Sequence, residues 1–285
     1  MSKKRLHIHL FFSLWLVTGL ACSLFTPGIS TPARGQTDTP SMTVTPTETA
    51  APPPTATATP PNTSTPEPLS QRVTLTSIHF EESGQAPKYT LTAETPNLTG
   101  ADDPRVTGFN QAADEIVQEN LNEFKASLKY QPAVPITSGS FIDVGYEVVS
   151  PHGDILSIIF RTVGYGDGAA HPYHYAQTLT YDLESGTQIS LDQIFMPGTD
   201  YLQAISDYCK TELAGRDIAF DAFSTGADPT AENYRNWNLI PAGLMITFDE
   251  YQVAAYAAGA QTVVIPYSTL RDILAPEGPV SKISG

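Results

Sequence analysis

The sequence has few cysteines, few basic residues and no apolar stretch long enough to cross a membrane as a mature helix. Only two of its 285 residues are cysteine, so we do not expect a structural disulfide. Its 15 basic residues face 30 acidic ones, giving a formal net charge of -15. This deficit argues against nucleic acid or an anionic membrane surface as the main partner, because both need positive charge. It suits a cationic partner, and it also suits an acidic surface that only provides solubility.

Catalytic motifs are also scarce. The chain contains no Gly-x-Ser-x-Gly segment, the turn that presents the nucleophile of α/β hydrolases. It has six histidines, at positions 7, 9, 79, 152, 171 and 174, and no His-x-x-x-His set with an Asp-Asp pair of the kind that deacetylases use. We therefore expect a protein that is not an enzyme and that carries no cofactor.

The first residues have the pattern of an export signal, which we place at residues 1–21. Basic residues precede an apolar run over residues 10–20 that is too short to span a bilayer. The Gly-Leu-Ala-Cys segment that ends at Cys22 fits a lipoprotein processing site, with Cys22 as the lipidated residue. It also fits ordinary signal cleavage, which would release the protein.

Residues 22–69 are predicted to hold the lipid anchor site and a disordered stalk, and from residue 31 onward threonine, proline, alanine and serine dominate, with almost no apolar bulk. Such a segment cannot bury enough surface to offset its ordering entropy, and its prolines favour an extended spacer. A long spacer is easier to explain for an anchored protein than for a released one. We therefore predict a lipoprotein that faces the exterior, is held to the membrane through Cys22 and carries its folded part on this stalk.

Residues 70–135 are predicted to form a small α+β domain with the order strand, strand, helix. Alternating residues indicate strands at 73–80 and 89–95, and Asp103-Pro104 then breaks the chain. From Phe109 to Tyr130, apolar residues recur at helical spacing along one face.

Residues 136–280 are predicted to form a second domain that is richer in strands. The expected strands lie at 141–149, 155–163, 173–182, 237–240, 244–248 and 261–266, and the expected helices at 191–195, 201–213 and 268–274. The first three strands are joined by short turns and indicate an antiparallel meander. Because strands and helices do not alternate strictly, the predicted fold class is α+β with helices packed on a β-meander. Cys209 falls on the apolar face of its helix, so we expect a buried thiol.

The most unusual segment is VGYGDGAAHPYHY, residues 163–175, which lies between two of the predicted strands. Its three glycines permit the positive φ of a wide turn, and Asp167 can accept hydrogen bonds from turn amides. Aromatic side chains on a turn that a rigid sheet carries also suit recognition. The predicted binding loop consists of Tyr165, Asp167, His171, Tyr173, His174 and Tyr175.

A metal site is one alternative interpretation of this segment. Asp167, His171 and His174, together with His152, are residue types that hold zinc with an open position. The extended backbone expected around Pro172 would, however, point the two nearby imidazoles to opposite faces. We therefore expect no metal.

A hydrolase is the other alternative. His171 would act as the base, Asp167 or Asp154 as the orienting acid, and Ser157 or Ser150 as the nucleophile. Adjacent carboxylates such as Asp249-Glu250 do not help, because neighbouring side chains diverge on a strand or a helix. The sequence contains no complete catalytic set.

Four motifs resemble an extracellular bacterial domain family. Residues 168–172, Gly-Ala-Ala-His-Pro, are similar to its Gly-Gly-Ala-His-Pro turn, and residues 181–186 are similar to its Tyr-Asp-Leu-x-Thr-Gly hairpin. Residues 191–195 and 248–259 resemble two further segments. The family is the C-terminal domain of the RsiV anti-sigma factor, which also accompanies the peptidoglycan deacetylase PdaC.

The resemblance implies a module that binds a ligand outside the cell, because the RsiV domain binds lysozyme. Its motifs look architectural, so no functional residue is carried over. We expect a surface binding module for an envelope ligand, either a cationic protein such as lysozyme or a cell-wall, peptidoglycan-related glycan. The alternatives are a cell-envelope hydrolase acting through residues 150–175 and a bystander structural domain in a larger surface assembly.

Overall fold

The computed structural model describes residues 67–283, so the predicted signal peptide, the lipidation site at Cys22 and most of the stalk lie outside the described residues. The described part begins with a short helix, α1 (Leu69–Arg72). A long hairpin follows, made of the twelve-residue strands β1 (Thr74–Gln85) and β2 (Lys88–Thr99). None of the described helices is long and apolar enough to cross a membrane.

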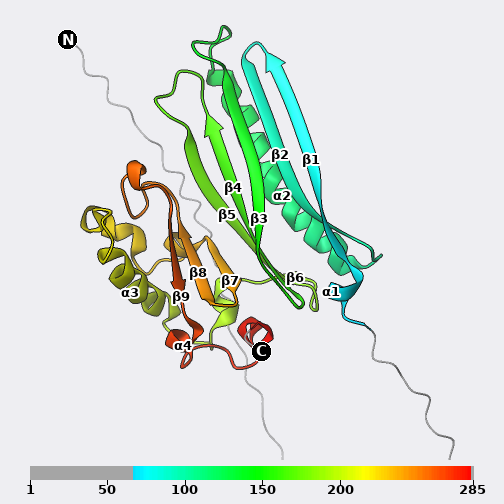
Figure 1. The fold of residues 1–285 in the computed structure, drawn as a ribbon, viewed down its shortest axis with the longest axis vertical. Helices are drawn as coiled ribbons and strands as arrows, with labels where there is room; N and C mark the ends of the chain where they lie inside the picture. Colours follow the sequence, from blue (N-terminus) through cyan, green and yellow to red (C-terminus); the bar gives the residue numbers. More distant parts are fainter. Residues whose placement is uncertain (1–66, 284–285) are drawn as a thin grey trace, which may run out of the picture. The chain divides into compact units, whose positions relative to one another are not determined.

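Helix α2 (Pro104–Ser127) follows the hairpin and covers one face of the sheet (Figure 1). The Asp103 carboxylate caps it by accepting a hydrogen bond from the Arg105 amide at 3.0 Å. Pro104 fits the first turn, where no amide donor is required. The helix therefore begins at the segment that the sequence indicated as a break, earlier than the predicted Phe109. The apolar stripe of the helix is buried, as predicted.

Six strands form one sheet in the order β1-β2-β3-β4-β5-β6. The later strands are β3 (Ser140–His152), β4 (Ile155–Tyr165), β5 (Tyr173–Asp182) and β6 (Thr187–Gln188). The β3 to β5 meander and the α+β class are confirmed. Strands β2 and β3 pair in parallel, because α2 carries the chain back along the sheet. The segments on either side of the division predicted at residue 135 thus share one sheet.

A second sheet, in the order β7-β8-β9, lies beside helix α3 (Figure 1). Its strands are β7 (Trp237–Ile240), β8 (Gly243–Phe248) and β9 (Gln261–Ile265), and α3 spans Tyr201–Ala214. Cys209 is fully buried on α3, and burial raises the pKa of its thiol to about 12, so the predicted core thiol is confirmed. The last predicted helix is shorter than expected, α4 (Tyr267–Leu270), because the chain then turns to form a β-bridge between Leu274 and Phe195.

Short 3₁₀ turns connect these elements. In the described part they are η1 (Leu128–Tyr130), η2 (Leu191–Ile194), η3 (Phe220–Ala227), η4 (Glu232–Tyr234), η5 (Tyr256–Ala258) and η6 (Pro279–Lys282). The predicted helix at 191–195 is the η2 turn, in which the Gln193 side chain accepts a hydrogen bond from the Ser190 amide at 2.9 Å.

The two sheets meet where β7 crosses β4. One apolar cluster fills the space between α2 and the large sheet, and another fills the space between α3 and the small sheet. Between them, Asn238 Nδ2 donates hydrogen bonds to Ser157 Oγ and to the Ile158 carbonyl, both at 3.0 Å. All described residues belong to one compact unit.

Candidate binding site beside the β4-β5 turn

Asp167 fixes the turn between β4 and β5. Its carboxylate accepts hydrogen bonds from the amides of Ile136 at 2.6 Å, Thr137 at 3.0 Å and Gly139 at 3.2 Å, and from the Thr137 hydroxyl. The Thr137 hydroxyl and these amides hold the pKa of Asp167 below its usual range. Asp167 therefore accepts amide bonds as predicted, although the donors belong to the segment that leads into β3. Because all these hydrogen bonds join the turn to the segment before β3, the Asp167 carboxylate has a structural role.

Replacing Asp167 with asparagine should lower the thermal unfolding midpoint at neutral pH. Because the folded-state pKa of Asp167 is lowered, its ionised form stabilises the fold above the unfolded pKa, and this contribution is lost as pH falls through the folded pKa. The difference between wild type and variant, measured by circular dichroism, should therefore shrink below about pH 4. Asp272→Asn, at an exposed aspartate, is the control. An equal difference at every pH would contradict this role.

His171 and His174 both lie against Tyr256, on the η5 turn that follows β8. The His171 and Tyr256 rings have centroids 4.0 Å apart, and His174 is 6.4 Å from the same ring. Tyr251 extends this aromatic cluster, with its ring tilted and 5.6 Å from the Tyr256 ring. The Tyr256 hydroxyl donates to the Pro172 carbonyl at 3.0 Å, which joins the two loops. The expectation that the two imidazoles point apart is therefore wrong.

His174 also faces a buried carboxylate. Its Nδ1 lies 2.9 Å from Glu250 Oε1, and the Glu250 side chain is only 12% exposed. The buried Nδ1 nevertheless makes no hydrogen bond. The pair brings an imidazole and a carboxylate together at the edge of a cleft, and both kinds of group can bond to a ligand hydroxyl or amide.

Asp249 fastens the loop after β8 to the large sheet. Its carboxylate accepts hydrogen bonds from the Ala176 amide at 2.8 Å and from Arg235 at 2.7 Å. The adjacent side chains of Asp249 and Glu250 thus diverge, as the sequence indicated. The next residue, Tyr251, has a φ of 64°, a left-handed conformation that a tyrosine rarely adopts and that clusters at functional sites. Tyr251 is 56% exposed, so its ring is open to solvent.

A cleft of about 240 Å³ lies between β4, β5 and this loop. It is lined by Arg161, Thr162, Val163, His174, Tyr175, Ala176, Asp249, Glu250 and Ala260. Its lining is largely apolar, and its ionisable groups are Arg161, His174, Asp249 and Glu250. Apolar walls with a few convergent polar groups are typical of ligand sites.

The rings of the other predicted loop residues make separate contacts, although Tyr175 also belongs to the lining of the cleft. Tyr173 is stacked on Tyr175 at 6.1 Å, and the Tyr175 hydroxyl donates to Asn120 of α2 at 2.6 Å, so both face the helix. Burial raises the pKa of Tyr175 to about 12. Tyr165 is stacked on Phe141 of β3 at 5.9 Å. Of the six predicted residues, the structure thus gathers His171 and His174 with Tyr256 and leaves the remaining aromatic rings in separate contacts.

The metal set is not assembled. His152 pairs with Ile155 at one end of the β3-β4 hairpin, and the turn that carries His171 follows the opposite end of β4. Among residues 67–283, no group of three or more His, Cys, Asp or Glu side chains is placed to hold a metal ion.

The catalytic serine set is not assembled either. Ser157 pairs with Thr180, whereas the turn follows the Gly164 and Tyr173 pair. Seven residues of strand separate them, or roughly 23 Å at about 3.3 Å per residue. Ser157 and Ser150 are both fully buried. Neither hydroxyl can therefore meet His171 or a substrate.

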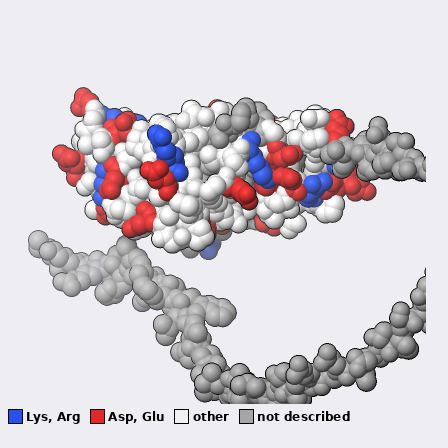
Figure 2. Space-filling view, turned by 90° about the horizontal axis from the view of Figure 1, so that it is seen from below, with Lys and Arg blue, Asp and Glu red and all other residues white. Residues whose placement is uncertain are grey.

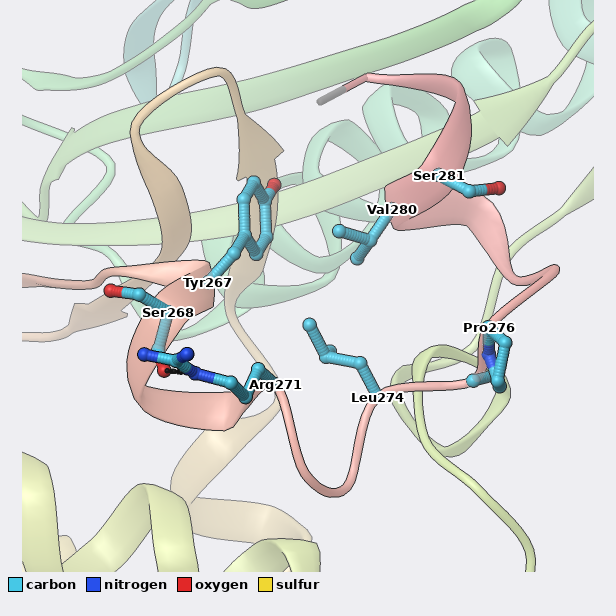
Figure 3. A pocket seen from close by; sticks show the side chains of 8 residues that line it. Tyr267, Ser268, Arg271, Leu274, Pro276, Val280 and Ser281 are labelled. Carbon is cyan, nitrogen blue, oxygen red and sulfur yellow. Dashed lines mark hydrogen bonds between the residues drawn. The ribbon is translucent and has the colours of Figure 1, made fainter. Parts of the chain in front are cut away.

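A larger hollow, of about 560 Å³, lies beside α4 (Figure 3). Tyr267, Leu274 and Val280 point toward its centre, and Arg271 lies at its edge with its Nε donating to the Ser268 carbonyl at 3.0 Å. This hollow contains no acid-base pair and no residue singled out from the sequence. We therefore place the candidate site at the smaller cleft.

Sequence reasoning missed Glu250, Tyr251 and Tyr256. They lie in the segment 248–259, which was noted for its family resemblance and, at Asp249-Glu250, only as a carboxylate pair that does not help a hydrolase. The signal that could have found them is chemical: a carboxylate and two tyrosines within one short loop suit recognition as well as the turn does.

Comparison with known proteins finds one family model that matches part of the chain. Residues 192–268 match the family described as a protein of unknown function, DUF3298. The peptidoglycan-N-acetylmuramic acid deacetylase PdaC of Bacillus subtilis (strain 168) is 29% identical over 169 residues, which cover 58% of this chain and 36% of that protein. The predicted similarity to PdaC is confirmed.

Esterase Rv3036c of Mycobacterium tuberculosis is 31% identical over 106 residues, which cover 36% of this chain and 45% of that protein. The chain therefore matches less than half of the length of either curated relative. A DUF3298 family member from Bacteroides fragilis NCTC 9343 has a TM-score of 0.57 at 17% identity, covering 74% of this chain and 97% of that one. A DUF3298 family protein from Pseudomonas aeruginosa PAO1 has a TM-score of 0.56 at 14% identity, covering 73% and 97%. These two likenesses concern the fold alone.

Proposed function

We propose that this chain is a non-catalytic binding module of the cell envelope, and that the cleft beside the β4-β5 turn binds a peptidoglycan-related glycan. The observation that carries the proposal is the aromatic cluster of Tyr251, Tyr256 and His171 next to the buried Glu250 and His174 pair. Sugar rings present apolar faces that rest on aromatic rings, and their hydroxyl groups bond to carboxylates and imidazoles.

The size of the cleft agrees with this ligand. Drug-sized molecules occupy sites of about 300 to 1,000 Å³, so a cleft of about 240 Å³ suits a single ring or its substituent. Neighbouring units of a chain would then extend over Tyr251, which is 56% exposed. Asp249 keeps this loop against β5 in the absence of ligand, which lowers the ordering cost of binding.

The relatives support an envelope role. PdaC is named as an enzyme that acts on peptidoglycan, and the matched part of this chain covers 36% of it. A module that held wall glycan on a tether would serve an anchored lipoprotein of the kind that the export signal, Cys22 and the stalk predict. The RsiV-type resemblance agrees with display outside the cell.

A cationic protein such as lysozyme is the second candidate ligand, favoured by the charge on the open face of the large sheet. Alternate side chains of β1 to β3 face away from α2 there and include Glu81, Glu94, Asp143 and Glu147. Two of these carboxylates have a basic neighbour: Arg161 lies 3.6 Å from Glu147, and His79 Nδ1 lies 2.7 Å from Glu94. Seen from below, in Figure 2, the molecule also carries widespread acidic side chains with basic ones beside them. Such a surface would attract a basic protein at low salt.

Calorimetric titration of the full chain with soluble peptidoglycan glycan fragments tests the first candidate. Tyr251→Ala and Tyr256→Ala should each weaken binding at least about tenfold, equivalent to about 1.4 kcal/mol. Tyr130→Ala, at a tyrosine that is 78% exposed, is the matched control and should bind normally. Absence of glycan binding by the wild type, or equal affinity of all variants, would refute the glycan site.

The same titration with lysozyme separates the second candidate. Binding there should weaken with added salt and in the double variant Asp143→Asn/Glu147→Gln, and it should not respond to Tyr256→Ala.

A further inference from the structure

Strand β1 forms the free edge of the six-stranded sheet. It ends the strand order, and no described strand pairs with its outer side (Figure 1). Its register with β2 runs from the Thr74 and Thr99 pair to the Gln85 and Lys88 pair without a shift, and the strand contains no proline. An edge of this length presents a row of unpaired N–H and C=O groups, which proteins usually shorten, bend or cover.

Two side chains on the α2 side of β1 are apolar and uncovered. Ile78 is 53% exposed and Phe80 is 40% exposed, although they lie opposite Thr95 and Ala93, which α2 covers. The helix reaches this edge through Lys125, whose Nζ lies 5.8 Å from the Phe80 ring centroid. Burial of these two side chains by a further strand would be favourable.

We infer that a second copy of this chain pairs with β1, antiparallel and about a two-fold axis at Phe80. In this register, a residue that lies a given number of positions before Phe80 faces the residue that lies the same number of positions after Phe80 in the other copy. Phe80 then faces Phe80, Ile78 faces Glu82, and His79 faces Glu81. The last contact occurs twice and sets a basic ring against a carboxylate, and no two like charges face each other.

Self-pairing fits this edge better than pairing with an unrelated peptide. When two copies of β1 run antiparallel, the residues that face each other are compatible in charge. A two-fold contact is also closed, so it removes the free edges of both copies and cannot propagate. A register shifted to centre on His79 would instead place two imidazoles against each other. The Phe80 register is therefore favoured, because it places each His79 opposite a carboxylate and not opposite another imidazole.

Analytical ultracentrifugation of the full chain carrying Cys22→Ser tests the pairing. The expected mass is that of a dimer, and Ile78→Lys/Phe80→Lys should reduce it to a monomer while the far-ultraviolet circular dichroism stays unchanged. Val264→Lys, at a residue that is 36% exposed on the edge strand β9, is the matched control and should remain dimeric. A wild type that is monomeric at all soluble concentrations, or a double variant that stays dimeric, overturns the inference.

Oxidative cross-linking tests the register independently of stability. Directly opposite Cα atoms in an antiparallel pair are about 4.5 to 5.5 Å apart, within the range of a disulfide. In the Cys22→Ser background, Phe80→Cys should therefore form a covalent dimer and His79→Cys should not. The remaining thiol, Cys209, is fully buried and should not react. Preferential cross-linking through His79→Cys would overturn the Phe80 register.

Discussion

Replacing Phe109 with alanine should lower the free energy of unfolding by about 3 to 5 kcal/mol and should weaken the whole described fold in one transition. Phe109 is fully buried on α2, and its ring meets the Tyr181 ring edge-on at 5.5 Å. Tyr181 belongs to β5, so this contact joins the predicted first domain to the second. The alanine would leave a cavity between a helix from residues 70–135 and a strand from residues 136–280.

Chemical denaturation followed by two probes measures this effect. Far-ultraviolet circular dichroism reports on all elements, whereas fluorescence of Trp237 reports on β7. Both transitions should shift together to lower denaturant concentration, because β2 and β3 share one sheet across residue 135. Tyr130→Ala, at an exposed aromatic residue, should leave both transitions in place. An unchanged Trp237 transition would instead mean that residues 70–135 unfold independently.

The local elements of this fold could be predicted, because they depend on short-range patterns. The apolar stripe of α2 and the alternation in β3 to β5 each lie within one segment, so the sequence is enough to find them. The parallel pairing of β2 with β3 could not be found in this way. Alternation shows which face of a strand is buried, but it does not show which strand lies beside it.

Only the part of the candidate site that lies in the β4-β5 turn could be predicted, again because sequence patterns report on short-range structure. His171 and His174 are part of a segment with a conspicuous composition, and Asp167 was expected to bind amides. Glu250 and Tyr256 reach the turn from the second sheet, through the bond of Asp249 to the Ala176 amide at 2.8 Å. That contact depends on how the two sheets pack against each other. The sequence of the turn alone does not show this packing.

Replacing Ser157 with alanine should lower the free energy of unfolding by about 1 to 3 kcal/mol, because it removes a buried acceptor. Ser157 Oγ accepts hydrogen bonds from the Leu239 amide at 3.1 Å and from Asn238 at 3.0 Å, and it lies 3.1 Å from the Thr180 hydroxyl. Asn238 keeps its bond to the Ile158 carbonyl, but the Leu239 amide would lose this side-chain acceptor. Thermal unfolding measures the loss, and Ser268→Ala, at an exposed serine, is the control.

The same variant separates a binding module from a hydrolase. Similarity to an esterase raises the question of a nucleophile, and Ser157 was the first residue that the sequence offered. A serine whose oxygen is bonded by neighbours on two sheets, and which lies roughly 23 Å along the strand from His171, serves to join those sheets. Ser157→Ala should therefore bind glycan fragments as the wild type does at temperatures where it is folded. Any turnover of a small acyl ester by the wild type should also persist in the variant. A folded variant that had lost such turnover would make Ser157 a nucleophile and would place the active site at the junction of the two sheets.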